Sequence, residues 1–205
     1  MNYLPFISGF ALLMACSSPY KHLERTNGDP GCLMQFKPSF SSALYKTRVN
    51  VTGKQLSGVL LIKTMPDSSI RMVFSNELGF KFFDFGFSLD SGFKVYYILK
   101  QMNKPAVIKT LRKDFELVLM LNIKNDHAYV LKDQAHHYYA FPQEKGINYY
   151  ITDPGCSRLL LMQRSSKRKA VVEAIMENYK NGLPDSIGIS HKNFNFDIGL
   201  KRIEQ

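Results

Sequence analysis

The sequence predicts a mostly β domain in which about ten to eleven antiparallel strands follow one another as hairpins, interrupted by one helix. Apolar and polar residues alternate with a period of two from residue 40 onward, the pattern of strands with one buried face. Short turn sequences separate these runs, and one stretch shows helical spacing instead. The 205 residues, 45% of them hydrophobic and 13% aromatic, suffice for one folded core and exclude a disordered chain.

An apolar N-terminal segment precedes this domain. Residues 4–16 are apolar but too few to span a bilayer as a helix, and such a run is typical of a signal peptide. It ends in Leu-Met-Ala-Cys, which resembles a bacterial lipobox, so Cys16 is the expected site of lipid attachment. The alternative, an N-terminal strand or core helix, lacks a capping residue at its start. The predicted divisions are a lipoprotein signal peptide over 1–15, a lipidated polar tether over 16–35 and a single β domain over 36–205.

Five strands are predicted before the helix. In the first, Tyr45, Thr47, Val49 and Val51 alternate with polar residues, so one face of the strand is apolar. Gly, Pro, Asn, Asp and Ser residues mark the turns between the strands. The five strands span 45–51, 56–64, 70–75, 80–88 and 93–99.

One helix is predicted over 103–121. Apolar residues recur at helical spacing from Val107 to Leu119, against a basic opposite face. Pro105 suits the first turn of a helix, and Asn103 can cap its N-terminus.

Strands resume after the helix and continue to the end of the chain. Residues 170–179 suit either a helix or a strand, and the Asn181-Gly182 turn that follows favours a strand. The later strands span 127–132, 136–141, 147–152, 158–164, 170–179, 187–191 and 194–203.

Two cysteines besides Cys16 lie in the same tetrapeptide, Asp-Pro-Gly-Cys. Cys32 and Cys156 can form a disulfide in an oxidising compartment, or stay apart as two buried thiols. Spacing along the chain does not decide between the two, because a disulfide needs Cα atoms within about 7 Å.

The strand 80–88 carries phenylalanines on both faces. By simple alternation Phe80 and Phe82 point to one face and Phe83, Phe85 and Phe87 to the other. Such a strand needs an apolar cover on each side, unless it lies in a sandwich core or a bulge at Phe82 breaks the alternation.

Three further segments are "SIRMVFSNELGFKFF" at 69–83, "LRKDFELVL" at 111–119 and "GLPDSIGISHKNFNFDIGLKRI" at 182–203. They resemble the LolA/LolB family of envelope proteins. The resemblance implies an open antiparallel β-half-barrel with a lid helix around 103–121, holding acyl chains against its concave face. The chain departs from LolB in having no tryptophan and in the length of its helix.

The resemblance also implies site residues. Leu78 and Gly79 match the loop that in LolB inserts cargo into the membrane, although Leu78 can instead fold back onto the sheet edge. The acyl-chain cavity is expected to be formed by the phenylalanines of two neighbouring strands and by the apolar stripe of the helix. These residues are Phe74, Phe83, Phe85, Phe87, Leu111 and Phe115.

Motifs for catalysis and metal binding are not found in the sequence. There is no nucleophile elbow, zinc-protease motif or phosphate-binding glycine loop. His136 and His137 are adjacent strand residues that face opposite sides, so they cannot chelate a metal together. We therefore expect no enzyme activity, no cofactor and no metal.

The expected function is that of a lipoprotein anchored in the bacterial outer membrane and facing the periplasm. It would bind acyl chains of lipoproteins or lipids and help to deliver them to the outer membrane, with a LolA-like periplasmic carrier as donor. The formal net charge of +10 suits contact with an anionic membrane surface, and export excludes nucleic acid as a partner. The alternatives are an adaptor lipoprotein that binds a protein partner, its cavity filled by its own side chains, and a glycolipid carrier.

Overall fold

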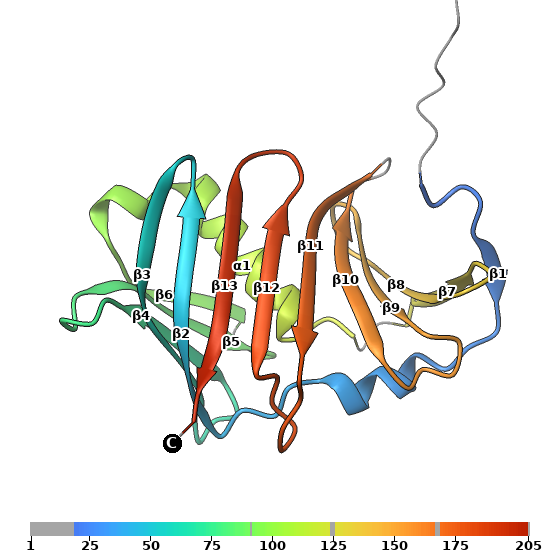
Figure 1. Cartoon of the computed structure of the whole chain (residues 1–205), viewed down its shortest axis with the longest axis horizontal. Helices are drawn as coiled ribbons and strands as arrows, with labels where there is room; N and C mark the ends of the chain where they lie inside the picture. Colours follow the sequence, from blue (N-terminus) through green and yellow to red (C-terminus); the bar gives the residue numbers. More distant parts are fainter. Residues whose placement is uncertain (1–18, 91, 124–125, 167–168, 205) are drawn as a thin grey trace, which may run out of the picture.

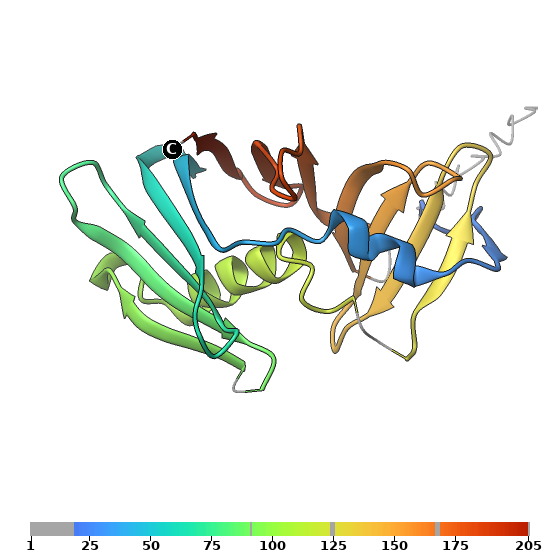
Figure 2. The ribbon, with the colours of Figure 1, turned by 90° about the horizontal axis from the view of Figure 1, so that it is seen from below.

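The computed structural model describes residues 19–204, apart from 91, 124–125 and 167–168. It contains one open antiparallel sheet, which curves around a long helix (Figures 1 and 2). The mostly β half-barrel is confirmed, but the sheet has 13 strands, more than the ten to eleven expected.

The first six strands are β1 Glu24–Thr26, β2 Ser42–Val51, β3 Lys54–Thr64, β4 Ile70–Ser75, β5 Lys81–Ser88 and β6 Gly92–Ile98. The others are β7 Tyr129–Lys132, β8 His137–Pro142, β9 Ile147–Thr152, β10 Leu159–Ser165, β11 Ala170–Glu177, β12 Ser186–His191 and β13 Phe196–Ile203.

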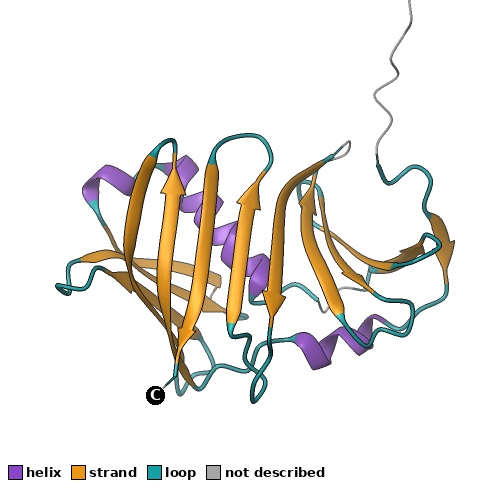
Figure 3. Cartoon of the chain, viewed as in Figure 1, coloured by secondary structure: helices purple, strands orange, loops and turns teal. Residues whose placement is uncertain are grey.

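The order of strands across the sheet is β1-β7-β8-β9-β10-β11-β12-β13-β2-β3-β4-β5-β6. The last strand of the chain pairs with β2, so that Phe196 lies opposite Val51 and Ile203 opposite Leu44. This pairing joins the hairpins before the helix to those after it in one continuous sheet (Figure 3). Residues 170–177 form β11, which confirms the strand that the following turn favours.

The helix α1 spans Pro105–Val118 and lies on the concave side of the sheet (Figure 2). It is shorter than the predicted 103–121, because the chain leaves helical geometry after Leu119 and Met120 adopts a φ of 51°. Asn103 is not its cap: the N-cap position is Lys104, whose side chain makes no capping hydrogen bond. Within the described residues, no helix is long and apolar enough to cross a membrane.

The segment predicted as a tether packs against the sheet over its described part, 19–35. Tyr20 stacks on Tyr149 with ring centroids 4.4 Å apart, and β1 pairs with β7. A 3-10 helix, η1 (Pro30–Phe36), then buries Leu33 completely in the core. The apolar residues of this segment lie between turn-forming residues and show neither helical nor strand spacing. Contacts with strands far away in the sequence therefore determine its structure. Cys16 and the lipobox motif lie outside the described residues.

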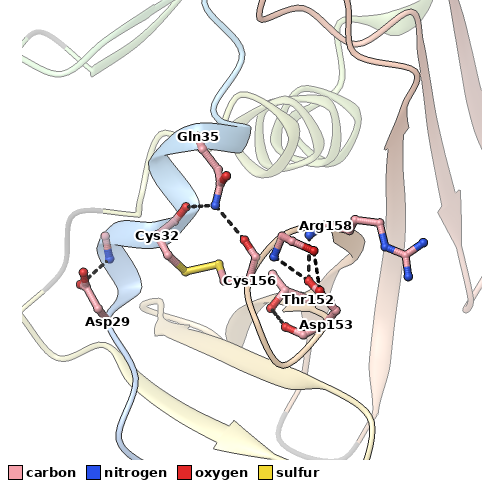
Figure 4. Close-up of a disulfide and its surroundings, with 9 residues drawn as sticks. Asp29, Cys32, Gln35, Thr152, Asp153, Cys156 and Arg158 are labelled. Atoms are coloured by element: carbon pink, nitrogen blue, oxygen red, sulfur yellow. Dashed lines mark hydrogen bonds between the residues drawn. A yellow bond between two sulfur atoms is a disulfide. The ribbon is translucent and has the colours of Figure 1, made fainter.

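Cys32 and Cys156 form a disulfide. Their sulfurs are 2.09 Å apart and their Cα atoms 6.5 Å apart. The side chain of Gln35 donates hydrogen bonds to the carbonyl oxygens of Cys32 and Cys156, at 3.0 and 2.7 Å (Figure 4). The sequence leaves open a disulfide or two separate buried thiols, and the structure contains the disulfide. It joins η1 to the turn between β9 and β10.

A bulge decides the side-chain directions in β5. Phe83 lies opposite Phe74 and Lys81 opposite Ser75, so Phe82 is the extra residue between two paired positions. The Phe82 ring therefore packs 4.8 Å from that of Phe74, on the same side of the sheet as Phe83. The alternative of a bulge at Phe82 is therefore correct, and β5 needs no apolar cover on its opposite face.

Candidate functional site

A cavity of about 400 Å³ lies between α1 and the concave face of the sheet. The sheet contributes apolar residues of β2, β3, β4, β5 and β13, and the helix contributes its inner stripe. Large side chains from two elements converge here because both the alternation of the strands and the helical stripe point inward. Apolar residues that line it include Val49, Leu56, Leu60, Val107 and Ile198.

Four of the six predicted cavity residues line this space, namely Phe74, Phe83, Leu111 and Phe115. Phe85 and Phe87 do not line it. Their rings are buried further along β5, where Phe93 packs 5.1 Å from Phe85 and 5.2 Å from Phe87. They share a face with Phe83, as predicted, but there the Phe93 ring of the neighbouring strand β6 packs beside them.

The open side of the cavity is marked by exposed lining residues from three turns. They are Thr52 between β2 and β3, Phe194 between β12 and β13, and Gln101 and Lys104 ahead of α1. Among the described residues that line the cavity, Lys104 is the only charged one. An apolar interior with a few polar groups at its mouth is the usual arrangement of a site for an amphipathic small molecule. Sequence reasoning missed both Lys104 and Phe194, because turn residues carry no periodic signal.

The lid helix is fastened to the sheet by a buried polar cluster. Asp114 of α1 has no solvent exposure, and its carboxylate accepts hydrogen bonds from Arg164 of β10 at 3.0 Å and from Nε2 of His191 of β12 at 2.8 Å. Tyr150 of β9 adds a hydrogen bond from its hydroxyl to the carbonyl oxygen of Leu117, at 3.1 Å. Sequence reasoning missed this cluster, although one signal was present: Asp114 is an acidic residue on the apolar side of the helix, directly before Phe115.

The loop between β4 and β5 exposes two large apolar side chains. Leu78 is 83% exposed and Phe80 is 68% exposed. The Asn76 side chain accepts hydrogen bonds from the backbone amides of both, at 3.0 and 2.9 Å, and Gly79 adopts a φ of 85°. The alternative in which Leu78 packs on the sheet edge is therefore wrong. Phe80 belongs to this loop and not to β5, which begins at Lys81. The sequence analysis did not include Phe80 among the candidate residues of the loop.

A larger cavity of about 720 Å³ lies on the outer face of the sheet, over β2, β13, β12 and β11. Gly188 and Gly199 pair directly at its floor; Ile175 lies over Gly188, and the space above Gly199 is open. Charged residues border it on both sides, with Lys46 and Arg48 of β2 on one side of the glycines and Glu173 and Glu177 of β11 on the other. A rim of mixed charges does not suit an acyl chain. The cavity between α1 and the concave face of the sheet is therefore the better candidate site.

No grouping of three or more potential metal ligands occurs among the described residues. His136 lies beside Asp133, with 3.4 Å between Nδ1 and Oδ1. Burial alone would raise the pKa of Asp133, but hydrogen bonds from the Ala135 amide, the Tyr138 hydroxyl and the His136 amide outweigh it and lower that pKa to about 2. The Asp133 carboxylate thus stabilises the turn before β8 through these hydrogen bonds.

The comparisons with known proteins agree with this geometry. The crystal structure of LolA superfamily protein NE2245 from Nitrosomonas europaea matches with a TM-score of 0.53 at 10% identity, over 87% of this chain and 93% of that chain. The chain has a LolA/LolB-like fold. A DUF1329 family protein from Desulfovibrio piger matches with a TM-score of 0.45 at 10% identity, over 85% of this chain and 90% of that one. A Vibrio parahaemolyticus domain described as outer membrane lipoprotein-sorting has a TM-score of 0.48 at 9% identity, with the same coverage.

These likenesses concern the fold, because the identities are far too low to carry a function across. No protein-family model matches the chain, and no curated protein matches it. What the LolA/LolB-like fold adds is the expectation of one curved sheet with a helix on its concave side, and the cavity lies between these two parts.

Filling the cavity tests the acyl binding expected from the sequence, and should weaken it without unfolding the protein. Thr110 of α1 lines the cavity and is partly exposed, so Thr110→Trp places an indole where a chain would lie. Displacing two or three methylenes at about 0.8 kcal/mol each predicts a loss of affinity of at least about tenfold. Titration with a fluorescent fatty acid measures it. The matched control is Lys109→Trp, on the exposed side of the same helix turn, and equal affinities for the two variants would place the site elsewhere.

Proposed function

We propose that this protein binds acyl chains in the cavity under α1 and passes them to a membrane through the loop that carries Leu78 and Phe80. The observation that carries the proposal is the cavity itself, whose walls are apolar and whose mouth is polar. Each methylene that enters contributes about 0.8 kcal/mol. The LolA/LolB-like fold supports the same reading.

The proposal includes the cellular setting expected from the sequence. Cys16 carries the lipid that anchors the protein in the outer membrane, the domain faces the periplasm, and the cargo is a lipoprotein or a lipid received from a LolA-like carrier. The disulfide between Cys32 and Cys156 supports an oxidising compartment. The role is binding and release, without catalysis.

The adaptor alternative has less support. It requires a cavity filled by the protein's own side chains, whereas about 400 Å³ stays open under the helix. The outer-face cavity with its mixed charges is a feature that suits a protein partner.

The role of the exposed loop is tested by Leu78→Glu. Because Leu78 contacts mainly solvent, the variant is expected to change the free energy of unfolding by less than about 0.5 kcal/mol and to keep its affinity for an acyl probe. A carboxylate at the membrane surface should nevertheless slow transfer of the probe to liposomes by at least about tenfold, since apolar contact is lost and charge is added.

Leu89→Glu is the matched control. Leu89 is 78% exposed in the turn at the opposite end of β5, so it equals Leu78 in burial and differs in position. Transfer by the Leu89 variant should match the wild type. If both variants transfer the probe at the wild-type rate, the loop has no part in delivery; if neither variant nor the wild type binds the probe, the binding function itself is wrong.

A further inference from the structure

We infer that the cavity takes one acyl chain at a time, from a single-chain amphiphile with an anionic head group. This inference rests on the proposed function and narrows its cargo. Three features carry it: the size of the cavity, the way in which the helix is held over it, and the charge at its mouth.

The size of the cavity allows one chain. A methylene occupies about as much volume as a water molecule in the liquid, about 30 Å³, so 400 Å³ holds about 13 of them. Three chains of sixteen carbons, as on a triacylated lipoprotein, would need about 1,400 Å³ on the same basis. The cavity is therefore several times too small for all the chains of such a cargo.

The helix is held against the sheet at the inner end of the cavity. Moving α1 away from the sheet would separate Asp114 from Arg164 and His191, all three of which are largely buried. Leaving a buried charge without its partner is far more costly than losing an exposed one. Tyr150 holds the same end of the helix through the carbonyl oxygen of Leu117. The cluster thus fixes the C-terminal half of α1 on the sheet, next to the end of the cavity that Leu111 and Phe115 line.

The charge at the mouth selects an anionic head group. Lys104 is exposed beside the opening, and no described carboxylate lines the cavity to oppose it. Gln101 and Thr52 add neutral hydrogen-bonding groups at the same opening. A carboxylate or phosphate at the end of a bound chain would meet Lys104, with an attraction that falls as salt rises.

A chain-length series tests the size. Fatty acids and lysophosphatidylglycerols of 8 to 18 carbons, below their critical micelle concentrations, compete with a fluorescent acyl probe on the delipidated full-length protein. Affinity should rise about fourfold per methylene and level off near 13 carbons. Binding of one series alone identifies the carboxylate or the phosphate head as the ligand. A continued rise to 18 carbons, or tighter binding of diacyl phosphatidylglycerol or a triacyl lipopeptide than of the one-chain compounds, would overturn the inference and leave acyl binding intact.

Charge reversal tests the head group. Lys104→Glu should lower the affinity for anionic chains about tenfold and leave that for a neutral monoacylglycerol unchanged, while Lys109→Glu, on the exposed side of α1, should change neither. If Lys104→Glu and Lys109→Glu bind anionic chains with the same affinity, the inferred preference for an anionic head group is wrong. If no acyl compound binds at all, the proposed function fails and the inference fails with it.

Discussion

Replacing Asp114 by alanine is expected to lower the free energy of unfolding by about 3–5 kcal/mol, the usual cost of removing one partner from a buried ion pair. The Arg164 side chain is 13% exposed and that of His191 only 2%, so neither is well placed to recover its lost partner from water. The variant should also loosen α1, since the carboxylate joins the helix to β10 and β12. Urea unfolding followed by circular dichroism measures the effect.

Two further variants separate charge from position. Asp90→Ala removes an exposed carboxylate in the turn after β5 and should change stability by less than about 0.5 kcal/mol. Asp114→Asn keeps the shape and one acceptor oxygen but not the charge, so it should fall between the wild type and the alanine variant. A loss below about 1 kcal/mol for Asp114→Ala would mean that Arg164 and His191 reach other partners, and the helix would then be free to move.

Loss of the disulfide is expected to have a similar effect. Cys32 and Cys156 are 124 residues apart, and closing so long a loop in the unfolded chain predicts a contribution of about 5 kcal/mol, at the upper end of the usual 2–5 kcal/mol. The bond also holds η1, with its buried Leu33, against the end of β9. The double variant Cys32→Ala/Cys156→Ala should therefore unfold at lower urea concentration than the wild type.

A reductant supplies the internal control. Dithiothreitol should lower the stability of the wild type to about that of the double variant and should leave the double variant unchanged. An unchanged wild type under full reduction, verified by thiol titration, would show that packing alone holds the N-terminal segment on the domain.

The elements of this domain that the sequence predicts well are those with long, regular patterns. The alternation from Tyr45 to Val51 is that of β2, and the stripe from Val107 to Val118 is that of α1. These runs of seven and twelve residues each repeat one period, so the buried face is specified locally. The resemblance over residues 69–83 anticipated the half-barrel, and four of its six expected cavity residues line the cavity.

Short or irregular segments were not predictable in the same way. The three residues of β1 and the seven of η1 are too few to show a period, and they are ordered by β7, by the disulfide and by the core. Likewise, the direction of Phe82 depends on the register between β4 and β5, which alternation within one strand cannot reveal.

By itself the sequence determined which faces are apolar, where most turns fall and that one helix accompanies a sheet of hairpins, because these follow from contacts between near neighbours in the chain. Only the tertiary structure decided that Asp114 meets Arg164 and His191, 50 and 77 residues away. It also decided that Phe85 and Phe87 pack beside Phe93 of β6, whereas Phe74 and Phe83 line the cavity. Such outcomes depend on strand register and on the position of the helix over the sheet, which many weak long-range contacts set together.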